Sequence, residues 1–95
     1  MTDEVPRLAE NVRRGERAKA LLDDPLFVEA VEKLKDRAYR AMLGADPFDD
    51  KELRSARLSF DALNKLLTEF RQMVTTGNLD RPILEERRRR KPPAR

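Results

Sequence analysis

The sequence predicts an all-α protein: an antiparallel, coiled-coil-like helical hairpin with an additional N-terminal helix and a disordered basic C-terminal tail. Three observations support this prediction: an unbroken heptad pattern in the second half of the chain, helix-start signals before two segments, and a basic run near the C-terminus. Hydrophobic residues make up 39% and charged residues 41% of the 95 positions, which suits a thin helical bundle with a small core.

The longest predicted helix covers residues 50–76. Its apolar residues alternate between spacings of three and four, which is typical of a coiled-coil seam. Asp49, followed three positions later by Glu52, resembles a capping box, and Gly77 marks the expected end of the helix. The stripe consists of Leu53, Ala56, Phe60, Leu63, Leu67, Phe70 and Val74.

A second helix is predicted over residues 25–43. Asp24 and Pro25 suit the N-cap and the first helical position, and Gly44 suits the residue after the helix. The short turn that follows favours antiparallel neighbours. The apolar face of this helix contains Phe27, Val31, Leu34, Ala38 and Ala41.

An N-terminal helix is predicted from about Pro6 to Leu22. Proline is tolerated in a first turn, where its missing N–H has no partner to lose. The apolar spacing includes Val12 and Gly15 but is interrupted by Lys19. Gly15 weakens such a helix by about 1 kcal/mol relative to alanine.

Additional apolar residues lie beside the stripe of the third predicted helix. Leu58, Leu66 and Met73 widen its apolar face beyond what one partner helix covers. We therefore predict that these three residues bind a partner, either a second copy of the chain or another protein. Two alternatives remain: the stripe is only the internal seam of the hairpin, or the N-terminal helix covers the extra face.

The basic character is concentrated at the C-terminus, and we divide the chain into a helical domain, residues 1–79, and a tail, residues 80–95. The whole chain has a net charge of +3, whereas residues 81–95 hold seven basic and two acidic residues. Like-charge repulsion and two prolines predict disorder from Arg87 onward. The candidate contacts to nucleic-acid phosphates or an acidic surface are Arg87, Arg88, Arg89, Arg90 and Lys91. The alternative for this run is a solubilising end without a partner.

Composition argues against enzymatic chemistry. The chain has neither Cys nor His, which removes thiolate ligands and the commonest general base. The paired acids at 23–24 and 49–50 stand where helix starts need negative charge. We therefore predict no catalytic, cofactor or metal site, no small-molecule substrate and no membrane partner. Without an apolar stretch near the N-terminus, cytoplasmic localisation is expected.

Residues 14–30 read RGERAKALLDDPLFVEA. This block resembles an RGxRAxxLLxDPLFxEA segment of small helical accessory proteins encoded in the virion-morphogenesis modules of tailed bacteriophages and prophages. The resemblance extends over about residues 13–77 and ends near Thr76 and Gly77. It implies a non-enzymatic, self-associating protein of particle assembly, located in the host cytoplasm or within the virion. The alternatives are a packaging accessory that binds DNA phosphates through its tail, and a small regulator of one host protein.

Overall fold

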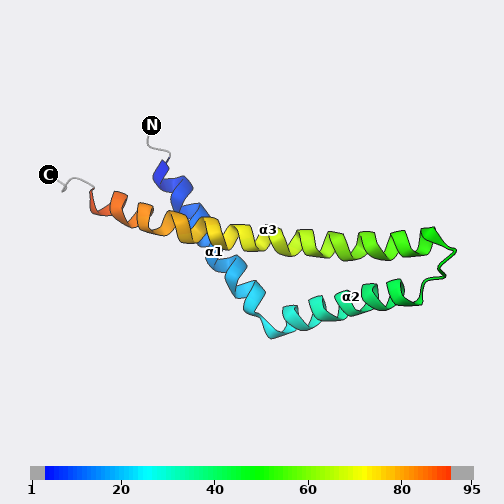
Figure 1. Ribbon diagram of the computed structural model, residues 1–95. Helices are drawn as coiled ribbons and strands as arrows, with labels where there is room; N and C mark the ends of the chain where they lie inside the picture. The colour runs from blue at the N-terminus through cyan, green and yellow to red at the C-terminus, as the bar shows by residue number, and fades with distance from the viewer. Residues whose placement is uncertain (1–3, 91–95) are drawn as a thin grey trace. The chain divides into compact units, whose positions relative to one another are not determined.

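The computed structural model describes residues 4–90, and its regular elements are three helices (Figure 1). They are α1 (Glu4–Asp23), α2 (Pro25–Gly44) and α3 (Asp50–Arg89). Residues 4–90 contain no strand, so the predicted all-α class is confirmed. None of the helices in this range combines the length and apolar character needed to cross a membrane.

The starts of α2 and α3 are fixed by aspartate caps, as predicted. The Asp24 carboxylate accepts hydrogen bonds from the backbone N–H groups of Leu26 and Phe27, at 2.8 and 3.2 Å. Asp49 accepts from the N–H groups two and three positions later, at 3.1 and 3.3 Å. These N–H groups have no partner inside the helix, so each cap stabilises its helix by about 1 kcal/mol.

The chain forms two compact units, and each is described by itself. The crossing unit contains residues 4–21 and 70–90 of the described chain, which are most of α1 and the C-terminal part of α3. The hairpin unit contains residues 22–69, which are α2, the following loop and the N-terminal part of α3. The helix α3 therefore contributes residues to both units.

The predicted end of the third helix near Thr76 is wrong, because α3 continues to Arg89. Gly77 lies inside the helix, and no glycine in residues 4–90 has a positive φ. Gly77 is buried three positions after Val74, so it continues the apolar stripe rather than ending the helix. Pro82 also lies inside α3.

This longer helix corrects two expectations about the tail. Residues 87–89 are helical, so the disorder predicted from Arg87 onward is wrong for these residues, and the boundary proposed after residue 79 falls within α3. The underlying reason is burial, because Leu84 is only 4% exposed and belongs to the core. Residues 91–95, with Lys91, lie outside the described residues.

The crossing unit is organised around two glycines in backbone contact. A Cβ atom added to Gly15 would lie 2.8 Å from the Met73 carbonyl oxygen and 3.1 Å from the Gly77 Cα. A Cβ atom added to Gly77 would lie 3.1 Å from both the Asn11 carbonyl oxygen and the Gly15 Cα. Figure 1 shows α1, in blue, crossing the yellow and orange part of α3. The two helices thus approach so closely that a Cβ atom at Gly15 requires a backbone shift, and a Cβ atom at Gly77 makes an unusually tight contact with backbone atoms.

The contacts of the crossing unit run in opposite directions along its two helices. Glu4 forms an ion pair with Arg87 at 2.6 Å, and the Asn11 side-chain amide donates to the Asp80 carboxylate at 2.8 Å. Partner numbers on α3 therefore fall as those on α1 rise, so the helices are antiparallel. The hydrogen bond from Asn11 is partly buried, and a polar pair of this kind fixes the register of packed helices.

An apolar core lies beside the glycine contact. Leu8 and Val12 of α1 pack with Leu84 of α3. Val5 and Ala9 are partly buried against this cluster. The predicted N-terminal helix is confirmed, and its packing face also includes the buried Ala18, which lies one position before the interrupting Lys19.

The hairpin unit has a sparser core, since its buried side chains are Ala38, Ala56 and Leu67. The predicted face of α2 is correct at Phe27, Val31 and Ala38 but wrong at Leu34 and Ala41, which are exposed. Half-buried Lys35 and Met42 take their places. At these two positions the half-buried residue is the next one in the sequence, and Lys35 can take such a place because the aliphatic stem of a lysine packs against apolar surface while its ammonium stays in water.

We predict that Gly15→Ala and Gly77→Ala each destabilise the protein by about 1–3 kcal/mol, because the new methyl group meets backbone atoms that cannot move independently. Helix propensity alone predicts the opposite sign, a gain of about 1 kcal/mol for each. Urea unfolding followed by circular dichroism measures the difference.

Gly44→Ala is the matched control, because a Cβ atom there meets nothing within 4 Å. It should stabilise the protein by about 0.4–1 kcal/mol. Stabilisation by all three substitutions would show that α1 and α3 do not touch at the glycines.

Candidate interaction surfaces

The hairpin unit has an open groove between α2 and α3. One part has a volume of about 700 Å³, and a neighbouring hollow measures about 380 Å³. Leu34 and Ser59 line both parts, so the two hollows form one continuous groove. The small side chains of the contact region leave this space between the helices unfilled. They are Ala38, Ala41, Ser55, Ala56, Ser59 and Ala62.

The three residues predicted to bind a partner lie in different places. Leu66 is 48% exposed and lines the hairpin groove together with Leu34, which is 49% exposed. Leu58 is 63% exposed and is not among the groove-lining residues. Met73 is half-buried and belongs to the crossing unit. Leu66 thus lies in the same groove as Leu34, a residue that the sequence prediction had assigned to the internal seam.

A second pocket lies in the crossing unit and has a volume of about 350 Å³. Its lining combines four apolar side chains from both helices with four charged side chains from α1. The apolar residues are Ala18, Leu21, Phe70 and Met73, and the charged ones are Glu10, Arg13, Arg14 and Arg17. We call it the arginine pocket. Apolar lining with a few charged groups is the usual make-up of a ligand site.

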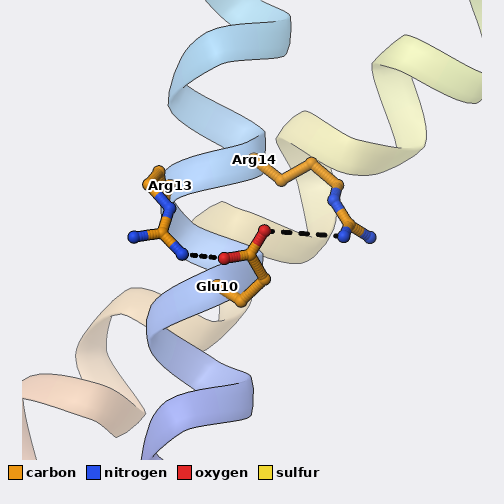
Figure 2. A network of polar contacts seen from close by, with 3 residues as sticks. All are labelled: Glu10, Arg13 and Arg14. Carbon is orange, nitrogen blue, oxygen red and sulfur yellow. Dashed lines mark hydrogen bonds and ion pairs between the residues drawn. The ribbon is translucent and has the colours of Figure 1, made fainter.

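The charges of the arginine pocket do not cancel. Glu10 forms ion pairs with Arg13 and, at 3.5 Å, with Arg14 (Figure 2). Within residues 4–90, Arg17 has no ion-pair partner. Three guanidinium groups and one carboxylate give the lining a formal charge of +2. The sequence signal was the spacing of three and four among these arginines on one predicted helix, which places them on one side.

The basic run near the C-terminus is helical up to Arg89. Arg87 pairs with Glu4, and Arg90 pairs with Glu86 at 2.7 Å. Arg88 and Arg89 are exposed. Four consecutive residues cover slightly more than one helical turn, so these arginines point to different sides rather than forming one basic face. Lys91, the fifth member of the run, lies outside the described residues.

The two units of the chain differ in net charge. Residues 1–21 and 70–95 contain 13 basic and seven acidic residues, a net charge of +6. Residues 22–69 contain eight basic and 11 acidic residues, a net charge of −3. Residues 1–21 contribute +1 of this charge and residues 70–95 contribute +5, so the net positive charge lies mainly toward the C-terminal end. The fold brings the arginines of α1 into the same unit.

Comparison with known proteins identifies no relative of this chain. No protein family matches the chain, and no curated protein or solved structure matches it significantly. Across residues 4–90, no group of three or more acidic side chains is arranged to hold a metal ion. The geometry of the groove, the arginine pocket and the basic end therefore carries the functional argument.

We predict that deleting residues 87–95 lowers the unfolding free energy by less than about 1 kcal/mol, because in the described part of this segment, residues 87–90, it removes two exposed ion pairs and no core side chain. Leu84→Ala should cost about 2–5 kcal/mol, since it opens a cavity beside Leu8 and Val12. Thermal and urea melts of both variants test the position of the domain boundary. Equal stability of the two variants would place Leu84 outside the core.

Proposed function

We propose that this chain is a non-enzymatic helical interaction protein that self-associates and serves as an accessory or structural protein of phage or prophage particle assembly. The observation that carries the proposal is the exposed apolar surface of the hairpin unit. Nine large apolar side chains in its 48 residues are at least 39% exposed. They are Leu26, Val28, Leu34, Tyr39, Leu43, Phe48, Leu53, Leu58 and Leu66. Two of them, Leu34 and Leu66, line one groove together with Leu63, and a continuous exposed apolar surface is typical of a site that binds another protein.

The groove between α2 and α3 suits an amphipathic helix as its partner. Its length follows the two helices, and its lining is apolar at Leu34, Leu63 and Leu66. A third helix laid into this groove would complete a coiled-coil-type seam, as helix-in-groove complexes do. Full burial of one leucine contributes about 1.5–3 kcal/mol, so a few such residues offset the cost of association.

The setting in particle assembly comes from the resemblance over residues 13–77. The resembling segments contain the glycines at 15 and 77, and these two residues meet where α1 crosses α3. They also contain Asp24, whose carboxylate caps α2. The shared residues thus coincide with positions on which this fold depends, which supports a common fold for such proteins. Particle assembly is also a setting in which many copies of one chain meet.

We predict self-association at micromolar concentration, measured by sedimentation equilibrium from about 1 to 500 μM. Leu66→Glu should weaken the association at least about tenfold, because it places a charge in the groove. Leu79→Glu is the control: Leu79 is 65% exposed on α3, belongs to the crossing unit and does not line the groove, and its variant should associate normally. A monomer at every concentration contradicts self-association, whereas equal effects of both variants contradict the use of the groove.

A second candidate function is a nucleic-acid-associated packaging accessory. The observation that favours it is the +6 charge of the crossing unit, with Arg88 and Arg89 exposed at the end of α3. Such a surface attracts phosphates without reading sequence.

The test of this candidate is a salt titration on random-sequence duplex DNA. We expect the logarithm of the binding constant to fall with the logarithm of the salt concentration with a slope of about −2 to −4, since each phosphate contact contributes roughly −0.9 to the slope. Deleting residues 87–95 removes six basic residues and should abolish most of the binding. A variant with Arg37→Gln and Arg40→Gln in the hairpin unit should bind like the parent. The absence of binding at low salt eliminates this candidate.

A further inference from the structure

The loop between α2 and α3 presents an exposed aromatic side chain among carboxylates. Phe48 is 94% exposed. The Asp46 carboxylate accepts a hydrogen bond from the Phe48 N–H at 2.9 Å, and the Asp46 carbonyl oxygen accepts one from the Asp49 N–H at 2.8 Å. These bonds hold a tight turn with Phe48 at its tip. Asp46, Asp49 and Asp50 surround the ring in sequence. We call this feature the acidic knob.

The arginine pocket has the complementary chemistry. Its apolar side chains, Leu21, Phe70 and Met73, can receive an aromatic ring, and its volume of about 350 Å³ lies in the range of small-ligand sites. Its excess of positive charge suits a ring that is flanked by carboxylates. An arginine can in addition lie over the face of an aromatic ring, which favours Phe over an aliphatic residue.

We infer that the acidic knob of one copy of this chain docks in the arginine pocket of a second copy. Phe48 enters between Leu21 and Met73, while Asp46 and Asp49 approach Arg17 and Arg14. Each carboxylate accepts backbone hydrogen bonds and still has free lone pairs for a guanidinium donor. Glu10 already pairs with two of the arginines, so Arg17 supplies the charge that is not yet matched.

Two features of the molecule favour a second copy as the occupant. The knob and the pocket that fits it belong to the same chain, and the units that carry them have opposite net charges, −3 and +6. Electrostatic complementarity of this kind selects the partner and its orientation. The contact uses the loop tip and α1 rather than the hairpin groove, so it goes beyond the proposed function and does not require it.

A contact between two different surfaces has a geometric consequence. Each copy that offers its knob still has a free pocket, so the association continues from copy to copy and closes into a ring or extends as a filament. One aromatic side chain and its neighbours bury a small area, which gives a weak contact, with a Kd on the order of 0.1–1 mM. Many such contacts within one assembly would act together through avidity.

Intermolecular paramagnetic relaxation enhancement tests this inference directly. Because the chain has no cysteine, Pro47→Cys gives a single site for a nitroxide label beside the knob. The labelled chain is mixed with an unlabelled, ¹⁵N-enriched chain, so every broadened signal reports contact between copies. We expect broadening at the amides of Ala18, Leu21 and Met73. Broadening confined to Leu34 and Leu66 would place the knob in the hairpin groove and overturn the inference.

Matched variants identify the side chains responsible. Phe48→Ala in the labelled chain should remove the broadening, which corresponds to a Kd at least about tenfold higher. Leu26→Ala is its control, because Leu26 is also an exposed apolar residue close to aspartates. In the enriched chain, Arg17→Glu should remove the broadening and Arg7→Glu, which makes the same change of charge outside the pocket, should not. Equal effects within either pair overturn the inference.

Sedimentation of the same variants separates the two proposals. If Leu66→Glu abolishes strong association while the broadening near Leu21 persists, both contacts exist independently. If the parent protein self-associates but shows no broadening in the crossing unit, only the knob contact is overturned. If the broadening is present and the parent shows no micromolar association, the hairpin proposal fails and the knob contact stands.

Discussion

Backbone contact between Gly15 and Gly77 is the constraint on which the crossing unit depends. With no side chain at either position, α1 can approach α3 until the Cβ of any other residue would lie within 2.8–3.1 Å of backbone atoms. This approach aligns Leu8 and Val12 with Leu84 and sets the antiparallel register that Asn11 and Asp80 then fix. It also brings Phe70 and Met73 beside the arginines of α1. The contact between the two glycines thus positions both the core and the arginine pocket.

The hairpin unit shows the opposite use of small residues. Alanine and serine in its contact region leave a groove open instead of bringing two backbones together. The apolar side chains that could have filled this space, such as Leu34 and Leu66, remain about half exposed. A unit with this surface gains stability when another helix covers it, which is the physical basis for the association that we propose.

How far the sequence could predict this structure depended on whether the signal was local. The starts of α2 and α3 followed from Asp24 and Asp49, because a cap acts on N–H groups within three residues of it. The end of α3 could not be read locally, since glycine ends helices more often than it continues them. The spacing held part of the answer: Gly77 lies three positions after Val74 and Leu84 lies seven positions after Gly77, although Arg81 occupies the stripe position between them.

The candidate sites were harder to predict for a related reason. The face of α2 had two possible registers that differ by one residue, and only packing distinguishes Leu34 from Lys35. The arginine pocket joins residues 10–21 to residues 70–73, so no local pattern reveals it. The sequence did identify Met73 as an unusual apolar residue, although its surroundings required the crossing of α1 and α3.

The long sequence separation between Gly15 and Gly77 has a consequence for synthesis on the ribosome. The partners of α1 lie about 60–80 residues later in the chain, so α1 leaves the exit tunnel well before the residues against which it packs. At about 5–20 residues per second, the wait between Gly15 and Gly77 is roughly 3–12 s. During that time Leu8 and Val12 are open to chaperones, and the crossing unit closes only when the last part of α3 has been released.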